Sequence, residues 1–235
     1  MKIKLFTIPN LLTLSNLFCG SAAVVSALVW GDLKLAFGLM VLAAVFDFFD
    51  GLAARALGAH STIGKDLDSL ADDVSFGVAP SLIVFSLFKE MPYPAYMEGT
   101  ATWLPYSAFL ISVFSALRLA KFNNDTRQTT SFIGLPVPAN ALFWGSLVAG
   151  YHSLLVSGDV HPLCLLAVVC LFSWLLVSEI PMFSLKFKNL SWKDNKVSFI
   201  FLLFCILFLV TLQVRGFATC IVWYILLSWF TDRKK

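Results

Sequence analysis

The sequence predicts an all-α fold, a polytopic bundle of about eight transmembrane helices. Two observations indicate this class. The mean hydropathy is +0.83 and only 13% of the 235 residues are charged, whereas a soluble domain has about 25% charged residues. Apolar runs of about the length that spans a bilayer as a helix also recur along the whole chain. Helices are expected because a helix satisfies its own backbone hydrogen bonds in lipid.

The apolar runs define the candidate spans. The first run continues past a region of small residues without a break, so we expect a retained helix rather than a cleavable signal peptide. A segment rich in Gly and Pro, residues 134–138, predicts an irregular entry into the fifth span. The spans lie at roughly 8–31, 33–57, 68–89, 103–122, 134–157, 161–180, 197–214 and 216–231.

The basic residues predict the orientation of these spans. With the N-terminus in the cytoplasm, all but three of the 17 Lys and Arg residues fall on the inner side. The exceptions are Lys34, Lys89 and Arg215. Basic residues gather in cytoplasmic loops of membrane proteins. We therefore expect a multi-pass protein of the cytoplasmic membrane with both termini in the cytoplasm.

Residues 47–72 hold five of the 14 acidic residues of the chain. At about 100° per residue, two aspartates and two small residues share one face of the second span. The short loop from Gly58 to Gly64 makes the second and third spans antiparallel neighbours. The residues that should meet between the two spans are Asp47, Asp50, Gly51 and Ala54 on the second, with Asp68 and Asp72 on the third.

Four carboxylates in a membrane bundle need a functional explanation. One Asp at mid-membrane costs about 2.5–3.5 kcal/mol, so four together approach the net stability of a domain, on the order of 10 kcal/mol. One explanation is the ion path of a cation-coupled transporter. The other is a site for hard divalent cations such as Mg²⁺ or Mn²⁺, which prefer carboxylate oxygens. Two cations about 3.5–4 Å apart suit in-line displacement at phosphorus.

The spacing of the cluster resembles the signature of the CDP-alcohol phosphotransferases, membrane enzymes that move a phosphoryl-linked group from a CDP carrier to an alcohol and release CMP. The pattern reads Asp47-x2-Asp50-Gly51-x2-Ala54-Arg55-x8-Gly64-x3-Asp68-x3-Asp72. The resemblance implies a pair of divalent cations, Mg²⁺ or Mn²⁺, held by the four aspartates. It also implies that Asp72 is the general base, which takes the proton of the acceptor hydroxyl.

The same resemblance implies the remaining architecture and the donor site. Six helices would form the core and two would be additional, so we expect one transmembrane catalytic domain over 1–235. Its core would be 1–185, and the additional helices would lie within 197–231. A homodimer is implied, with the active site at the cytoplasmic face. The residues implied to bind the CDP-linked donor are Asn10, Thr13, Gly51, Ala54, Arg55 and Ser61.

Stretches outside the cluster resemble the membrane-embedded phosphatidylserine synthases within this family, over roughly residues 8–185. They lie at 68–81, 118–123, 132–140 and 180–184. The implied reaction transfers the phosphatidyl group of CDP-diacylglycerol to the hydroxyl of L-serine, giving phosphatidylserine and CMP. Membrane lipid is the implied surrounding, and no nucleic acid is expected as a partner.

The choice of acceptor depends on few residues. Arg118 is the candidate for binding the serine carboxylate, because a guanidinium pairs with a carboxylate through two hydrogen bonds. The alternative is that Arg118 marks a helix end at the membrane boundary. Glycerol 3-phosphate or an inositol phosphate is the alternative acceptor, although either would need a more basic pocket. Lys121 and Asn140 stand where the resemblance would have Arg and a small residue.

Overall fold

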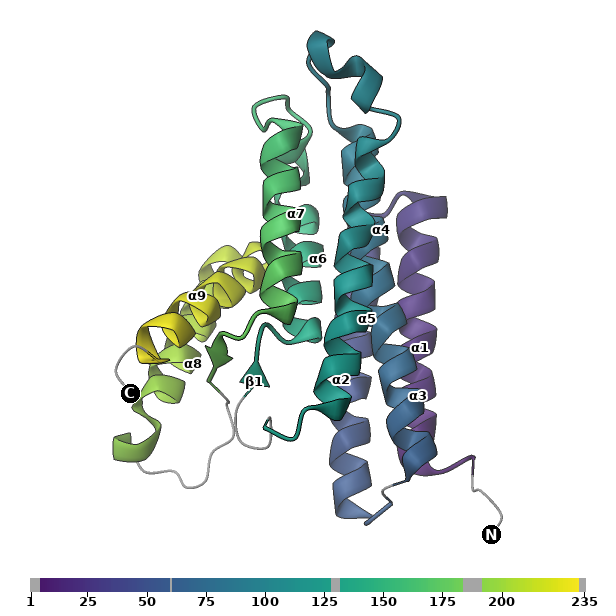
Figure 1. Ribbon diagram of the computed structural model, residues 1–235, viewed down its shortest axis with the longest axis vertical. Helices are drawn as coiled ribbons and strands as arrows, with labels where there is room; N and C mark the ends of the chain where they lie inside the picture. Colours follow the sequence, from purple (N-terminus) through teal and green to yellow (C-terminus); the bar gives the residue numbers. More distant parts are fainter. Residues whose placement is uncertain (1–4, 60, 128–131, 184–191, 233–235) are drawn as a thin grey trace.

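The computed structural model describes residues 5–59, 61–127, 132–183 and 192–232, and these form an all-α bundle (Figure 1). The long helices run side by side along the vertical axis of Figure 1, and the last two helices lie obliquely at one side. Within the described residues, the only strand pairing joins two strands of two residues each. The expected fold class, a helical membrane bundle, is therefore confirmed.

Three long helices lie in the first ninety residues, and two of them contain a π-helical segment. In these two helices, the α-helix continues directly into the π-helical segment. The first is α1 (Ile8–Val25) with the π-helical residues Ser26–Trp30, followed by α2 (Leu33–Ala56). The second is α3 (Thr62–Asp72), the π-helical segment Asp73–Val78, and α4 (Ala79–Glu90).

After α4, two short 3₁₀ helices, Ala95–Thr100 and Leu104–Ala108, lead into α5 (Phe109–Asn124). The remaining elements are β1 (Phe132–Ile133), α6 (Val137–Leu155), α7 (Pro162–Val177), β2 (Pro181–Met182), α8 (Trp192–Leu212) and α9 (Val214–Asp232). The contacts of α9 with α6 join the last helix pair to the rest of the bundle.

Each predicted span coincides with a helix, but two boundaries were wrong. The third span was expected from residue 68 after a loop ending at Gly64, whereas α3 begins at Thr62. Ser61 caps this helix, since its hydroxyl accepts a hydrogen bond of 3.1 Å from the backbone N–H of Gly64. The fourth span was expected from residue 103, and 3₁₀ turns precede α5 there.

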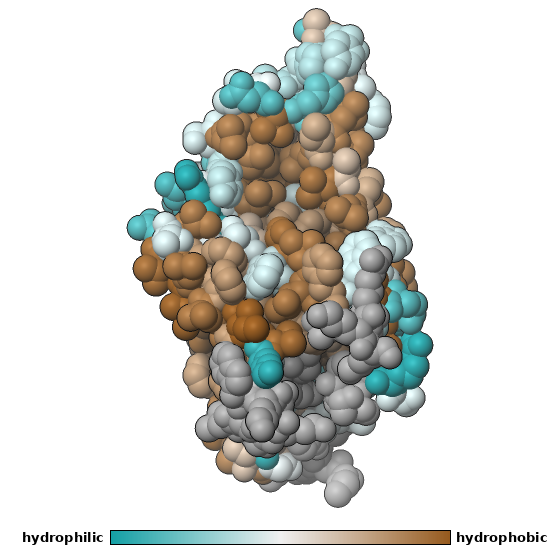
Figure 2. Space-filling view, turned by 90° about the vertical axis from the view of Figure 1, so that its left-hand side faces the viewer, coloured by the Kyte–Doolittle hydropathy of each residue, from teal (hydrophilic) through white to brown (hydrophobic). Residues whose placement is uncertain are grey.

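Four helical stretches among the described residues are long and apolar enough to cross a membrane: 8–30, 33–56, 62–90 and 195–212. Two shorter apolar helices, 162–177 and 214–230, accompany them. Figure 2 shows one face of the molecule, where apolar side chains cover most of the middle and hydrophilic ones gather near the top and at the margins. This distribution fits a bundle surrounded by lipid.

The irregular entry into α6 is confirmed and is fixed by Gly134. This glycine has φ +80°, and its backbone N–H donates a 2.8 Å hydrogen bond to the carbonyl oxygen of Ile180. A Cβ at this position would lie 2.6 Å from the carbonyl oxygen of Leu176. Next to it, β1 pairs with β2 in antiparallel register, with Phe132 opposite Met182. The pairing attaches the segment before α6 to the end of α7.

Candidate active site

The four aspartates of the cluster converge between α2 and α3. Carboxylate oxygens of Asp47, Asp50 and Asp68 all lie within 4.8 Å of one another. Asp72, one turn further along α3 than Asp68, is close enough to interact electrostatically with all three. Asp50 and Asp72 are buried, and Asp47 and Asp68 are half-buried. Side chains 25 residues apart in sequence therefore share one small volume.

The hydrogen bonds to this cluster come from α1. The hydroxyl of Thr13 donates a 2.6 Å hydrogen bond to Asp50 Oδ2, and the side-chain amide of Asn16 donates a 3.1 Å hydrogen bond to Asp72 Oδ1. Each bond occupies one oxygen of its carboxylate. The sequence alone does not single out Asn16 for the site, although its position one helical turn from Thr13 places it on the same face of α1.

The donor set of this cluster fits a divalent cation. The ion pairs identified among the described residues lie at other acidic side chains. Asp68 Oδ1 is buried and has no hydrogen-bond partner within the described part of the chain. Buried carboxylates are normally paired or bound to a metal. Hard cations such as Mg²⁺ and Mn²⁺ take oxygen ligands of this kind.

A first cavity of about 550 Å³ opens on one side of the aspartates, between α1, α2 and the start of α3. All six residues predicted to bind the donor line it: Asn10, Thr13, Gly51, Ala54, Arg55 and Ser61. The first turn of α3 also lines this cavity, through Thr62 and Gly64. Backbone N–H groups at a helix N-terminus favour bound phosphate.

A second cavity of about 480 Å³ opens on the other side of the aspartates. Asp47, Asp72 and Arg118 line it, together with Phe122 and Phe132. Only 3% of Arg118 is exposed, and its guanidinium carbon lies 5.4 Å from the centre of the Phe122 ring. A buried guanidinium therefore belongs to the same cavity as Asp72.

The two cavities share part of their walls. The residues that line both are Asp50, Gly51, Arg55 and Asp68. A Cβ on Gly51 would lie 3.4 Å from the guanidinium of Arg55, so these two residues of the shared wall are neighbours. Two ligands, one in each cavity, would therefore meet beside the carboxylates.

Polar side chains at the C-terminal end of α5 add to the second cavity. Asn123 lines it and donates a 2.7 Å hydrogen bond from its side chain to the hydroxyl of Ser69. Lys65 donates a 3.0 Å hydrogen bond to the carbonyl oxygen of Asn123. These two hydrogen bonds join α3 to α5. They could not be predicted from the spacing of residues within one helix, because they link two helices.

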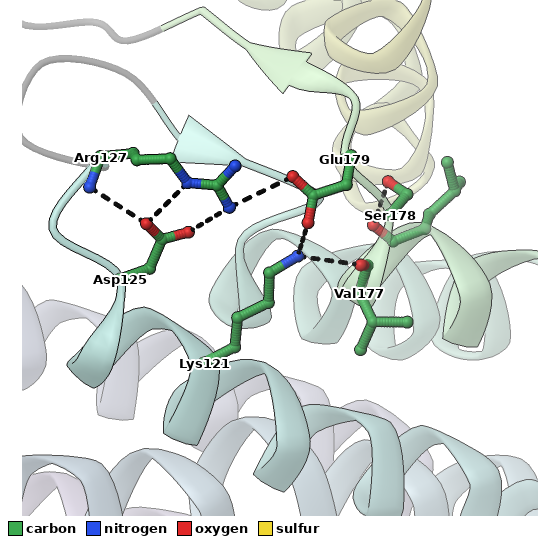
Figure 3. A network of polar contacts seen from close by, with 7 residues as sticks. Lys121, Asp125, Arg127, Val177, Ser178 and Glu179 are labelled. Carbon is green, nitrogen blue, oxygen red and sulfur yellow. Dashed lines mark hydrogen bonds and ion pairs between the residues drawn. The ribbon is translucent and has the colours of Figure 1, made fainter.

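Lys121 belongs to a polar network that joins α5 to the end of α7 (Figure 3). Its ammonium contacts Glu179 Oε1 at 2.5 Å and donates a 3.1 Å hydrogen bond to the carbonyl oxygen of Val177. Arg127 contacts Asp125 Oδ2 at 2.7 Å and Glu179 Oε2 at 3.3 Å. The hydrogen bond from Lys121 holds the pKa of Glu179 below its usual value. Lys121 therefore acts as a link between helices.

Asn140, the other departure from the resemblance, is fully buried in α6. Its side chain has no hydrogen-bond partner among the described residues, and it lines neither cavity. Within the described part of the chain, Asn140 therefore makes no hydrogen bond to the aspartates.

Comparison with known proteins finds several relatives that match most of this chain. The CDP-diacylglycerol–serine O-phosphatidyltransferase of Bacillus subtilis is 36% identical over 173 residues, which is 74% of this chain and 88% of the relative. The protein of the same name from Helicobacter pylori (strain ATCC 700392 / 26695) is 35% identical, covering 80% of this chain and 76% of the relative. That of Methanocaldococcus jannaschii is 32% identical, covering 75% and 74%. The model of the CDP-alcohol phosphatidyltransferase family matches residues 6–177.

Proposed function

Because the chain belongs to the CDP-alcohol phosphatidyltransferase family, and is therefore a membrane phosphotransferase, we propose that its substrates are CDP-diacylglycerol and L-serine. The phosphatidyl group would pass to the serine hydroxyl, giving phosphatidylserine and CMP. The printed names of the relatives support this choice of donor and acceptor.

The observation that carries the proposal is the pair of cavities with a shared wall. A displacement without a covalent enzyme intermediate needs donor and acceptor present together, with the reacting phosphorus between them. The two cavities offer separate space for two ligands, and Asp50 and Asp68 line both. Such positioning lowers the barrier by converting a bimolecular step into an intramolecular one.

The first cavity suits the CDP part of the donor. Arg55 and the N-terminus of α3 supply positive potential for the diphosphate. Asn10 offers amide groups for the cytidine or ribose. Gly51 and Ala54 leave the floor of the cavity free of bulky side chains. Thr13 supports the site indirectly, since its hydroxyl is bonded to Asp50.

Members of this family generally depend on a divalent cation, and the residues that would hold it here are Asp47, Asp50, Asp68 and Asp72. Mg²⁺ or Mn²⁺, two ions in this proposal, would neutralise the negative charge that builds up on the diphosphate during displacement. The hydrogen bonds from Thr13 and Asn16 orient two of these carboxylates before any ligand binds.

The second cavity suits serine. Arg118 would bind the serine carboxylate and so direct the hydroxyl toward Asp72. As the serine oxygen forms its bond to the phosphorus that bears the diacylglycerol, Asp72 accepts the hydroxyl proton. The bond from that phosphorus to the CMP oxygen breaks, and the electron pair leaves with CMP. Asp72 therefore acts as the general base.

The proposal includes the placement of the protein in the membrane. The distribution of basic residues supports the cytoplasmic membrane, with both termini and the active site on the cytoplasmic side. The basic residues at both termini and at 186 and 188 lie outside the described residues. The family resemblance supports a homodimer.

The test is an acceptor comparison on purified protein in detergent, with CDP-diacylglycerol and Mg²⁺ or Mn²⁺. CMP release is measured with L-serine, glycerol 3-phosphate and an inositol phosphate in parallel. We expect CMP and phosphatidylserine with serine, and no CMP above background with the two phosphorylated acceptors. CMP release with glycerol 3-phosphate but not with serine would contradict the proposal.

A further inference from the structure

Helices α8 and α9 follow the part of the chain that the family model matches, which ends at residue 177. Arg215, at the start of α9, donates a 2.7 Å hydrogen bond to the carbonyl oxygen of Gly150 in α6. Its guanidinium carbon also lies 4.8 Å from the centre of the Tyr151 ring. Phe217 packs edge-on against Phe37 of α2, with the ring centres 5.5 Å apart. The α8–α9 pair is therefore docked on the core.

Tyr224 of α9 is the residue through which this pair reaches β2. It is buried, and its hydroxyl donates a 2.9 Å hydrogen bond to the carbonyl oxygen of Phe183, the residue after β2. The Phe183 ring centre lies 4.9 Å from that of Tyr224 and 5.4 Å from that of Phe201 in α8. Both helices of the pair thus hold the end of β2.

The strand pair carries this contact to the second cavity. Met182 of β2 is fully buried and lies opposite Phe132 of β1. Phe132 lines the second cavity, and its ring centre lies 6.0 Å from that of Phe122, which lines it as well. Displacement of Phe183 would therefore move β2, and through β1 it would move an aromatic wall of the cavity.

Tyr224 is also near Arg118. The two side chains are close enough to interact electrostatically, although Tyr224 itself does not line the second cavity. Tyr224 therefore interacts with the guanidinium that is proposed to bind the serine carboxylate, without forming part of the cavity wall. The lining residues of the first cavity all lie between Pro9 and Asp68, so neither α8 nor α9 contributes to its wall.

We propose that Tyr224 is a positioning residue for the acceptor: its hydrogen bond to Phe183 fixes the wall of the second cavity and hence the affinity for serine, while donor binding is independent of it. The α8–α9 pair would then set acceptor affinity from outside the family core. This inference rests on the proposed function, because it assigns the second cavity to serine.

The test is the Tyr224→Phe variant, which removes the hydroxyl and keeps the ring. Tyr106→Phe is the matched control, since Tyr106 is exposed and lines neither cavity. We expect the KM for serine to rise about threefold to tenfold in Tyr224→Phe, the range for loss of one hydrogen bond. The KM for CDP-diacylglycerol and kcat should stay within about twofold of the wild type, since general loss of structure would move all three constants.

A double variant tests whether Tyr224 acts through the strand pair. Phe132→Leu alone should raise the KM for serine, and adding Tyr224→Phe should raise it little further, because coupled residues are not additive. If Tyr224→Phe has the same KM for serine as Tyr106→Phe, the inference is overturned and the proposed function is unaffected. An equal rise in the KM for serine and the KM for CDP-diacylglycerol in Tyr224→Phe would overturn it as well. So would a double variant in which the two substitutions raise the KM for serine independently. Absence of serine turnover in wild-type protein would instead contradict the proposed function.

Discussion

At the scale of single residues, α1 determines how two of the four aspartates are oriented. Thr13 and Asn16 each donate one hydrogen bond to a carboxylate on a neighbouring helix, at 2.6 and 3.1 Å. Hydrogen bonds to charged groups contribute about 1.5–3 kcal/mol each. The carboxylates of Asp50 and Asp72 are thus pre-oriented by uncharged donors that do not neutralise them.

Replacement of the proposed base tests its role. Asp72→Asn keeps the size of the side chain and the hydrogen-bond capacity toward Asn16, but removes the proton acceptor. We expect kcat to fall about 10²–10⁴-fold, the usual contribution of a positioned base. Asp66→Asn, an exposed position on the same helix that lines neither cavity, is the control and should keep wild-type kcat. Steady-state CMP release measures both, and a kcat for Asp72→Asn within tenfold of the wild type would rule out this role.

The aspartates could be predicted from sequence because their cost in a membrane and their helical spacing point to one shared site. The six donor residues were named from a family pattern, and all of them line one cavity. Asn16 could not be assigned, because an Asn in a membrane helix is equally suited to bonding between helices. Its partner, Asp72, is 56 residues away in sequence, and only the packing of α1 on α3 brings the two together.

At the scale of elements, the continuous helix from Thr62 to Glu90 holds the site. The apolar pattern predicted a start at residue 68, because the first turns carry Lys65 and Asp66 and do not look like a membrane span. The capping residue Ser61 was the local signal for the true start. The π-helical segment Asp73–Val78, directly after Asp72, has no hydropathy signature. Hydropathy reflects only how strongly side chains prefer lipid to water. It therefore locates the apolar span, but it does not detect the polar first turns of the helix or its π-helical segment.

A close crossing holds α1 against this helix and can be tested with two glycines. A Cβ at Gly20 would lie 2.6 Å from the Cα of Ser75, whose hydroxyl donates a hydrogen bond to the carbonyl oxygen of Asn16. Gly20→Ala should therefore push α1 away, destabilise the protein by about 1–3 kcal/mol, and reduce turnover by displacing Asn16. A Cβ at Gly38 of α2 meets no atom within 4 Å, so Gly38→Ala is the matched control.

Thermal unfolding in detergent and CMP release are measured on both glycine variants. Gly38→Ala should unfold at or above the wild-type temperature, since Gly in a helix costs about 0.8–1.0 kcal/mol relative to Ala. The prediction for Gly20 is wrong if Gly20→Ala has the same unfolding temperature and the same rate of CMP release as Gly38→Ala.

At the scale of the whole molecule, α8 and α9 pack together, and α9 contacts α6 and β2. The division into a core of 1–185 and an additional pair within 197–231 stays a prediction, as do the homodimer and the orientation in the membrane. The sequence indicated two further helices correctly. The way in which these helices dock could not be predicted from the sequence. Arg215, Phe217 and Tyr224 contact α6, α2 and the residue after β2, respectively, and no local sequence pattern indicates these contacts.

Binding of a divalent cation should stabilise the entire bundle, because it relieves repulsion among four carboxylates on two helices. We expect Mg²⁺ or Mn²⁺ to raise the unfolding temperature in detergent and EDTA to reverse the rise. At a free concentration 100 times the Kd, the gain is about 2.7 kcal/mol. Asp68→Asn should reduce the shift, and Asp66→Asn should keep it in full. Equal shifts in the two variants would place the cation elsewhere.

The shared wall of the two cavities has a consequence for inhibition patterns. On the proposed function, CMP would occupy the first cavity alone, where it meets Arg55 and the start of α3. It would then compete with CDP-diacylglycerol and leave serine free to enter beside it. Product inhibition by CMP should accordingly be relieved by raising the lipid concentration and not by raising serine. Turnover would follow the ratio of CDP-diacylglycerol to CMP at a fixed supply of the amino acid.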